Sequence, residues 1–253
     1  MSDLLECKQQ GRVFRITLNR PDKRNALNME ICRALVDTFE RANRDRSSGA
    51  ILLDANGKAF SAGMDLDEVR NRVPADINNF HEQLFTIGAR ITKPIICAVH
   101  GAALAGGMGL VANCHIVIAA PDSTFGLTEI RLGLWPFLVF RAVTAAIGER
   151  HALALALTGR IFSAEEARQF SLVHEITPDP HQRAFEIAES IGAMSPTAVR
   201  IGMRFTQQIR NQDWDVAGEI ARRVRDEVFQ SRDFQEGLHA FFEKRPPKWP
   251  SLE

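Results

Sequence analysis

Short apolar segments alternate with helical patterns through the first two-thirds of the chain, and only helical patterns follow. The segments Val13–Leu18, Ala50–Asp54, Pro94–Val99 and Ile116–Ala119 are mostly apolar, and an amphipathic stretch, Asn28–Arg44, separates the first two. Short apolar runs of this kind predict buried strands. The order therefore predicts an α/β layered core followed by an α-helical subdomain.

The helical patterns also indicate where the two parts of the chain meet. Phe80–Ile91 is amphipathic and predicts a helix within the core, whereas Trp214–Phe242 predicts a long helix near the C-terminus. A chain of 253 residues is long enough for one main domain with a helical tail. We place the boundary between a core of residues 1–195 and a helical region of residues 196–253.

Charge and cysteine usage argue against several classes of protein. Lys and Arg together number 31, as do Asp and Glu, so nothing in the balance indicates a nucleic-acid or membrane-surface partner. The N-terminal segment lacks the basic flank and apolar run of a signal peptide, and no uninterrupted apolar stretch reaches membrane-spanning length, so we expect a cytoplasmic protein. The four cysteines form no CxxC pair, which favours free thiols over a disulfide framework or a metal site.

Two glycine-containing turns are candidates for binding an oxygen atom through backbone N–H groups. The first, Ala59–Leu66, contains small residues that let the backbone turn sharply. The second, Gly101–Gly109, leads from an apolar strand into a helix, whose N-terminus favours negative charge. It has neither the GxGxxG nor the GxxxxGK[ST] spacing, so a nucleotide-phosphate site is not supported. Taken alone, each turn is also compatible with ordinary close packing.

Glu129 is the candidate acid or base. It lies among apolar residues between Gly126 and Gly133. A carboxyl group in such surroundings holds its proton more tightly, which suits proton transfer near neutral pH. The alternative is a surface ion pair with Arg131, and the local sequence alone slightly favours that alternative.

Six segments in one order together resemble the crotonase (enoyl-CoA hydratase/isomerase) superfamily. The resemblance covers nearly the whole chain, and no single segment decides it. The segments are Leu18–Leu27, Phe60–Leu66, Gly101–Gly107, Phe125–Gly133, Leu157–Ala167 and Phe242–Trp249. The resemblance implies an α/β, ClpP/crotonase-like fold of repeated ββα units with an α-helical C-terminal subdomain. It also makes residues 196–253 a trimerisation region.

The resemblance implies a substrate and a partner as well. The substrate is an acyl-CoA thioester, so CoA is part of the substrate and the chain needs no separate cofactor and no metal. The partners are further copies of the same chain, in a homotrimer or a homohexamer built of two trimers. Nucleic acid and membrane are not expected as partners.

The resemblance assigns roles to individual residues by their place in the matching segments. It implies that the backbone N–H groups of Met64 and Gly106 form an oxyanion hole for the thioester oxygen, and that Glu129 is the catalytic carboxylate. Losing one such donor costs on the order of 10²–10³ in rate. The residues expected to contact CoA or the acyl chain are Arg24, Ala26, Ala62, Gly63, Asp65, Leu66, Gly107, Trp135 and Phe137. For Trp135 and Phe137, ordinary core packing is an equal alternative.

One position departs from the hydratases of the superfamily. By resemblance, those hydratases use two glutamates. One lies at the position of Glu129, and the other lies in the helix after the glycine run, where this chain has Gly109. A single carboxylate is enough to remove a proton from C2 of a 3-enoyl-CoA and to return it at C4. The leading hypothesis is therefore an enzyme similar to the Δ3,Δ2-enoyl-CoA isomerases.

Two alternatives stay open. A hydratase would need another group in place of the missing carboxylate. Glu68, His81 and Glu82 lie in a segment that borders the pocket by resemblance, although a solvated helix face is the favoured interpretation of all three. A non-catalytic acyl-CoA-binding member would bind CoA without turnover and would be indifferent to the loss of the Glu129 carboxylate.

Overall fold

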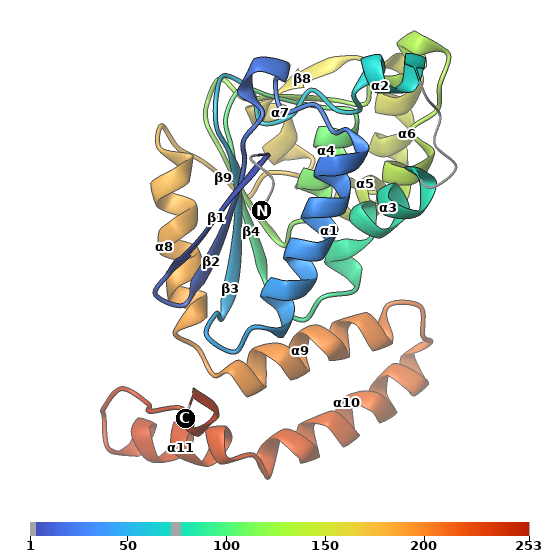
Figure 1. The fold of residues 1–253 in the computed structure, drawn as a ribbon. Helices are drawn as coiled ribbons and strands as arrows, with labels where there is room; N and C mark the ends of the chain where they lie inside the picture. Colours follow the sequence, from blue (N-terminus) through green and yellow to red (C-terminus); the bar gives the residue numbers. More distant parts are fainter. Residues whose placement is uncertain (1–3, 72–76, 253) are drawn as a thin grey trace.

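The larger of two β-sheets forms the centre of the molecule (Figure 1). A computed structural model describes residues 4–71 and 77–252. Within these residues the sheet has six strands in the order β1-β2-β3-β4-β6-β9, and all neighbours are parallel except the antiparallel pair β1-β2. The strands are β1 (Leu5–Gln10), β2 (Val13–Leu18), β3 (Ala50–Ala55), β4 (Ile95–Val99), β6 (Ile116–Ala119) and β9 (Glu175–Ile176).

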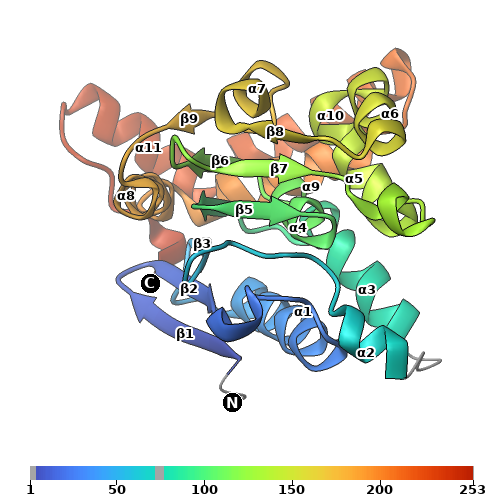
Figure 2. The same cartoon turned by 90° about the horizontal axis from the view of Figure 1, so that it is seen from above.

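Three short strands form a second sheet beside the first (Figure 2). They are β5 (Ala102–Leu104), β7 (Thr124–Gly126) and β8 (Ile161–Ser163). The strands β5 and β7 are parallel, and β8 runs antiparallel to β7. Because β4 and β6 are parallel neighbours, the chain leaves both at the same edge and enters β5 and β7 side by side.

Helices cover both faces of the larger sheet. On one face lies α8 (Pro180–Gly192), and on the other lie α1 (Met29–Arg44), α3 (Ile77–Phe85) and α4 (Gly106–Ala112) (Figure 1). The remaining helices are α2 (Leu66–Asn71), α5 (Phe137–Ile147), α6 (Glu149–Thr158), α7 (Ala164–Gln169), α9 (Pro196–Ile209), α10 (Trp214–Phe229) and α11 (Arg232–Phe242). The 3-10 turns are η1 (Pro21–Lys23), η2 (Ile87–Ala89), η3 (Glu129–Leu132) and η4 (Pro250–Leu252).

Side-chain alternation along the strands explains why both faces need a cover. Leu52 and Ile96 pack on the side of α8, whereas Ile51, Leu53 and Cys97 point into the larger core on the opposite side. All five side chains are fully buried. A strand buried on both faces is necessarily an almost continuous apolar run, which is the pattern that the sequence displays.

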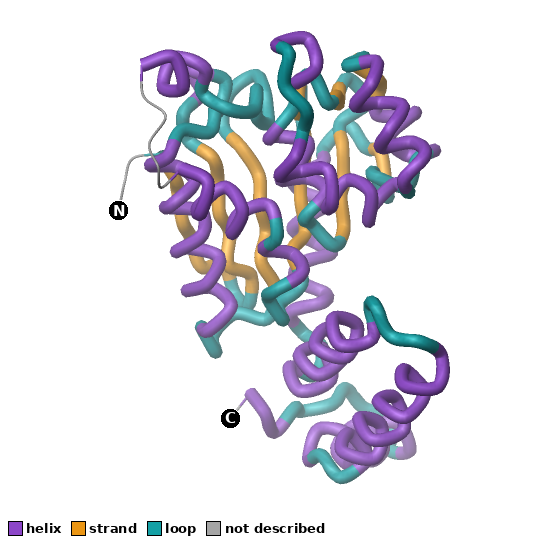
Figure 3. Tube along the Cα trace, turned by 90° about the vertical axis from the view of Figure 1, so that its right-hand side faces the viewer, coloured by secondary structure: helices purple, strands orange, loops and turns teal. Residues whose placement is uncertain are grey.

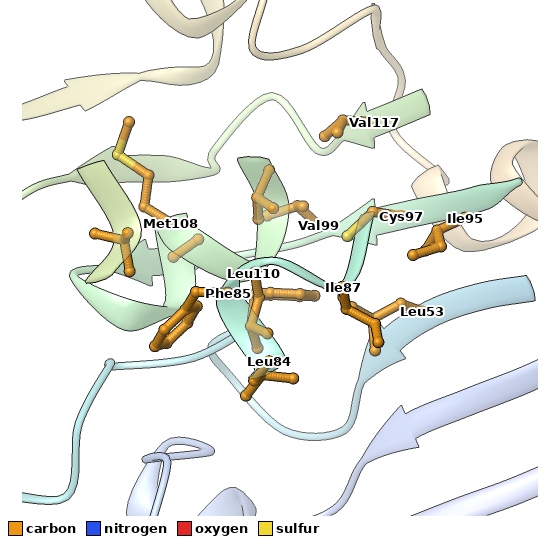
Figure 4. Close-up of a cluster of buried hydrophobic side chains, with 14 of the residues drawn as sticks. Leu53, Leu84, Phe85, Ile87, Ile95, Cys97, Val99, Met108, Leu110 and Val117 are labelled. Carbon is orange, nitrogen blue, oxygen red and sulfur yellow. The ribbon is translucent and has the colours of Figure 1, made fainter. Parts of the chain in front are cut away.

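The larger core also joins α3 to α4 (Figure 4). Leu84 and Phe85 of α3 lie near Met108 and Leu110 of α4, and all four belong to one cluster of buried side chains. Burial of each such side chain contributes roughly 1.5–3 kcal/mol. This packing holds α3 against the helix that follows the glycine run, and it builds one wall of the candidate site.

The helix predicted for Phe80–Ile91 is wrong in its bounds, because α3 ends at Phe85. The side chain of Asn113 replaces the helical bonds beyond that point. Its Nδ2 donates to the Phe85 carbonyl oxygen at 2.9 Å, and its Oδ1 accepts from Gly88 N at 3.2 Å. The chain therefore leaves the helix and continues as the single turn η2.

The helices α9, α10 and α11 extend away from one end of the sheets (Figures 1 and 3). The single helix predicted for Trp214–Phe242 is wrong: the chain breaks between α10 and α11, where Ser231 Oγ accepts from Phe234 N at 3.2 Å and caps the second helix. The first of the three helices starts at Pro196, where the predicted C-terminal region begins. None of the residues of α10 is buried.

Candidate active site

A cavity of about 450 Å³ lies between α3, the N-terminus of α4, η3 and α5. This volume is typical of a pocket for a small ligand. The lining is largely apolar, and its polar side chains among the described residues are His81, Thr128 and Glu129. Met64 and Gly106 line it too, so the two glycine-containing turns meet at one place.

The segment that carries Met64 runs like a strand beside Leu27. Leu27 N donates to the Gly63 carbonyl oxygen at 2.7 Å, and Asp65 N donates to the Leu27 carbonyl oxygen at 3.0 Å. In such a parallel pair the N–H of the residue between the two bonded positions points away from the partner strand. The N–H of Met64 donates to no residue that the structure describes, so it is free for a ligand oxygen.

Ala105 turns the second glycine segment toward the Met64 N–H group. Its φ of 50° and ψ of −119° are a combination that residues with a Cβ atom rarely adopt. Backbone strain of this kind costs on the order of 1–3 kcal/mol and clusters at functional sites. The turn is fixed by Ala105 N, which donates to the Gly126 carbonyl oxygen at 2.8 Å. Gly106 then begins α4, so its N–H is one of the unpaired donors at a helix N-terminus.

Gly63 and Gly107 let the two turns touch through their backbones. A Cβ atom on Gly63, where φ is +89°, would lie 2.8 Å from the Leu104 carbonyl oxygen and 3.2 Å from Gly106 N. A Cβ atom on Gly107 would lie 2.5 Å from the Ser61 carbonyl oxygen. Any other residue would push the backbones apart, so the two glycines bring both predicted N–H donors to one wall of the cavity.

Glu129 lies at the start of η3, directly after β7. Its Oε2 atom is buried and has no hydrogen-bond partner among the described residues. Burial raises the pKa of this carboxyl group, because a low-dielectric environment disfavours the charged form. Arg131 is exposed and forms no ion pair with Glu129, so the alternative of a surface ion pair is wrong. The sequence prediction of a carboxyl group in an apolar environment is confirmed.

The space beside Gly109 is filled by apolar side chains. A Cβ atom on Gly109 would lie 2.3 Å from Val139 Cγ1 and 3.2 Å from Phe85 Cδ1. Val139 and Phe85 themselves line the cavity. A carboxylate-bearing side chain at position 109 has no room unless this wall moves. Neither Val139 nor Phe85 is predictable as a site residue from the sequence, because nothing local marks a residue of α5 or α3 as a neighbour of α4.

Four residues assigned to CoA or the acyl chain lie in two segments. Arg24 and Ala26 follow η1, whereas Asp65 and Leu66 lie at the start of α2. Arg24 is exposed and Ala26 is half-buried. The Asp65 carboxylate is 2.6 Å from the Arg20 guanidinium, which leaves only its backbone for a ligand. This ion pair lowers the pKa of Asp65 even though burial opposes it. Leu66 is exposed and lines the cavity.

The aromatic residues of the following segment differ in burial. Trp135 is half-buried, and its ring centre lies 5.6 Å from that of Phe140. Phe137, at the first position of α5, is 72% exposed. Both line the cavity, as does Ala62. The exposure of Phe137 excludes the core-packing alternative for that residue, whereas Trp135 has both a packing contact and a face on the cavity.

The three acid–base residues that resemblance placed near the pocket have different surroundings. Glu68 Oε2 accepts from Met29 N at 2.9 Å, at the start of α1. Glu82 is solvent-facing and lies 3.6 Å from Arg90. His81 is only 6% exposed and lines the cavity, so the interpretation as a solvated helix face is wrong for this residue.

Among the described residues, two backbone N–H donors and the buried Oε2 atom of Glu129 have no hydrogen-bond partner. Such a site defines a class of enzyme that stabilises negative charge on an acyl oxygen while a proton moves. The chain belongs to the enoyl-CoA hydratase/isomerase family, whose model matches residues 8–251. This family is part of the crotonase superfamily, which the six sequence segments resemble, and it acts on acyl-CoA thioesters.

Individual relatives agree with this assignment along almost the whole chain. The 2,3-dehydroadipyl-CoA hydratase of Escherichia coli is 32% identical over 251 residues, which are 98% of each chain. The crystal structure of an enoyl-CoA hydratase from Mycobacterium smegmatis superposes with a TM-score of 0.92 at 30% identity, covering 98% of this chain and 99% of the other. For an enoyl-CoA hydratase from Shewanella pealeana the TM-score is 0.91 at 31% identity, with 97% and 96% covered. The predicted crotonase-like fold is confirmed.

Three further observations concern the described residues as a whole. None of their helices is long and apolar enough to cross a membrane. They contain no group of three or more His, Cys, Asp or Glu side chains arranged to hold a metal ion. The four cysteines are free thiols in the structure, and Cys32 and Cys97 are buried.

Proposed function

We propose that the protein moves the double bond of a 3-enoyl-CoA to the 2-position, with Glu129 as the group that carries the proton. One observation carries this proposal. Glu129 is the carboxylate that lines the cavity, and its buried Oε2 atom has no partner among the described residues. Val139 and Phe85 occupy the space in which a second carboxylate would lie at position 109.

The steps follow from the position of the donors. Glu129 removes a proton from C2, and the electron pair of that C–H bond moves through C1 onto the thioester oxygen. The N–H groups of Met64 and Gly106 stabilise the resulting dienolate. The electrons then return, a C2=C3 double bond forms, and C4 takes the proton back from Glu129. One carboxylate serves both transfers, and no water is consumed.

The apolar lining supports the same chemistry. Leu132, Leu134, Trp135 and Phe137 line the cavity, so an unsubstituted acyl chain would replace water there. Electrostatic interactions strengthen when water leaves a site of low dielectric constant. The two N–H donors therefore act more strongly on the dienolate oxygen than they would in water.

Parallel assays test the proposal. Purified protein is mixed with a cis-3-enoyl-CoA and, separately, with crotonyl-CoA, alongside the Glu129→Gln variant. We expect isomerisation by the natural protein and its loss in the variant. Failure of the natural protein to isomerise any 3-enoyl-CoA of short or medium chain length would contradict the proposal.

Hydration is the second candidate, and the names of the relatives favour it. The Escherichia coli relative is a 2,3-dehydroadipyl-CoA hydratase, and the two structural neighbours are enoyl-CoA hydratases. In this chain, hydration requires a second polar group beside Glu129. A non-catalytic acyl-CoA-binding protein is the third candidate, and it predicts CoA binding without either reaction.

We further propose that the chain assembles as a homotrimer or as a homohexamer of two trimers through residues 196–253. The support is the apolar surface of the C-terminal helices, where Trp214 is 94% exposed and Phe241 and Phe242 are 77% exposed. Light scattering coupled to size exclusion measures the mass, and a monomer at micromolar concentration would contradict the proposal. A cytoplasmic location remains a prediction of the sequence, to be tested by fractionating cells.

A further inference from the structure

His81 is a buried polar side chain that faces the cavity and has no hydrogen-bond partner among the described residues 4–71 and 77–252. It is 6% exposed and lines the same cavity as Glu129. Neither ring nitrogen forms a hydrogen bond with a residue that the structure describes; the recorded contact is with the ring of Phe85, at 6.0 Å between centres. Buried polar groups in folded proteins almost always have a hydrogen-bond partner. An unpartnered imidazole at a cavity wall therefore points to a partner that enters with the ligand or the solvent.

The position of His81 follows from the register of α3. His81, Leu84 and Phe85 are three or four residues apart, so they share one face of the helix. Leu84 and Phe85 are buried in the larger core, and their burial turns His81 inward as well. Glu82 lies on the other side of the helix, where it is exposed. The fold therefore places the imidazole, and not the neighbouring carboxylate, at the cavity.

The other acidic groups near the cavity are already engaged. Asp65 pairs with Arg20, and Glu68 accepts from the backbone at the start of α1. Among the described residues that line the cavity, His81 and Glu129 are the acid–base side chains. The phenyl ring that fills the space beside Gly109 belongs to Phe85, which is in ring contact with His81. The imidazole is thus near the region where the missing carboxylate would have been.

We propose that His81 and Glu129 together bind a water molecule and give this site a second activity, the addition of water across the double bond of a 2-enoyl-CoA. A buried water typically needs two to four polar partners, and these two side chains supply two. The inference rests on the proposed function, because it uses the same N–H donors and the same Glu129 carboxyl group. It differs in needing a second proton-transfer group, which isomerisation does not.

The reaction balances with these two groups. The water oxygen forms a bond to C3 while one of its O–H bonds breaks, and a neutral imidazole nitrogen of His81 takes that proton. The π electrons of the C2=C3 bond move onto the thioester oxygen, where the Met64 and Gly106 N–H groups hold them. As the enolate collapses, C2 takes a proton from the carboxyl group of Glu129. The imidazolium then loses its proton and the carboxylate regains one through solvent.

Burial favours the protonation states that this reaction needs. It lowers the pKa of His81 and raises the pKa of Glu129, since in each case the charged form is poorly solvated. A neutral imidazole is a proton acceptor, and a neutral carboxyl group is a proton donor. Two titratable groups whose surroundings favour complementary states are typical of an acid–base pair.

The test separates the two activities in one set of variants. Hydration of crotonyl-CoA and isomerisation of a cis-3-enoyl-CoA are measured for the natural protein and for His81→Leu, His81→Gln and Glu129→Gln. We expect both His81 variants to lose hydration by roughly 10²–10⁴-fold, so that the ratio of hydration to isomerisation falls by at least about tenfold, because only hydration needs the second group. Glu129→Gln should abolish both. His239→Gln, which removes an exposed histidine of α11, is the matched control.

Further readouts exclude a merely structural role. Circular dichroism and CoA affinity check that the variants are folded, and His81→Gln keeps a hydrogen-bonding side chain of similar length without a comparable base. Added imidazole should restore part of the hydration in His81→Ala and none in Glu129→Gln. Hydration that is absent from the natural protein, or that persists in His81→Leu and His81→Gln, overturns the inference. Absence of isomerisation alone overturns the proposed function and leaves a His81-dependent hydration intact.

Discussion

Two walls of one cavity differ in the groups that they offer to a substrate. The wall formed by η3 and the two glycine turns carries the carboxyl group of Glu129 and two N–H donors that are unpaired within the part of the chain that the structure describes. The wall formed around α4 is apolar at Gly109, where Val139 and Phe85 fill the space. The first wall is arranged to stabilise and move charge, whereas the second leaves no room for a side chain at position 109.

The space of the missing carboxylate is therefore filled by protein atoms. If position 109 were merely truncated, a cavity would remain there, and such cavities cost stability. Instead, a side chain from α5 and another from α3 pack onto the glycine. The reaction of this site is therefore determined as much by which residues close the apolar wall as by the carboxylate that remains.

The largest expected effect is at the polar wall. Glu129→Gln should lower isomerase turnover by roughly 10²–10⁴-fold, the usual contribution of a general acid or base. The melting temperature should stay the same or rise, since the variant removes a carboxylate whose buried Oε2 atom has no partner among the described residues. Steady-state kinetics and calorimetry measure the two quantities, with Glu82→Gln on the surface of α3 as control. Retention of more than a tenth of the activity would rule out Glu129 as the proton carrier.

The next largest effect concerns the N–H donors. Gly63→Ala should lower kcat by roughly 10²–10³-fold, because the added Cβ atom meets the Leu104 carbonyl oxygen at 2.8 Å and displaces the donors. Gly202→Ala, where nothing lies within 4 Å of the new Cβ atom, should leave kcat unchanged. Equal kcat values for the two variants would show that the Gly63 turn does not position the donors.

The activity and the stability of the protein should depend on pH in opposite ways because of Glu129. Isomerisation needs the Glu129 carboxylate, so kcat/KM should fall about tenfold per pH unit below a pKa that burial has raised. Stability has the opposite dependence. A carboxyl group whose pKa is raised on folding stabilises the folded state below its unfolded pKa, and that contribution is lost as pH rises through the folded pKa. Denaturant titrations at several pH values should show this loss of unfolding free energy in the natural protein and not in Glu129→Gln. The same dependence of unfolding free energy on pH in both proteins would contradict the prediction.

The smallest expected effect is at the apolar wall. Gly109→Glu should lower the free energy of unfolding by about 1–3 kcal/mol through overpacking, without increasing hydration. Val139→Ala in the same chain should return part of this loss, because Val139 Cγ1 is the atom that a Cβ atom at position 109 meets first. Denaturant unfolding of the two single variants and the double variant measures the coupling. A gain in hydration by Gly109→Glu alone would mean that Val139 and Phe85 move aside easily and that the apolar wall does not determine the reaction.

The fold could be predicted where periodicity was strong. The buried strands at Ala50–Ala55 and Ile95–Val99 and the helix capped by Asn28 lie where the sequence indicated them. Strands of three residues, such as β5 and β7, were not identified, because so few residues give no measurable period. The C-terminal end of α3 was misplaced because a distant side chain, that of Asn113, takes the backbone groups that a longer helix would pair.

The sequence by itself determined which residue types were available. It contained the glycine turns, the carboxyl group of Glu129 and the absence of a side chain at Gly109, and their order along the chain identified the family. Only the tertiary structure decided what those residues face. Burial of Glu129, closure of the space at Gly109 by Val139 and the inward position of His81 all depend on packing between elements far apart in sequence. Local periodicity carries no information about such contacts, because it fixes the face of a helix on which a side chain lies but not the neighbour that this face meets.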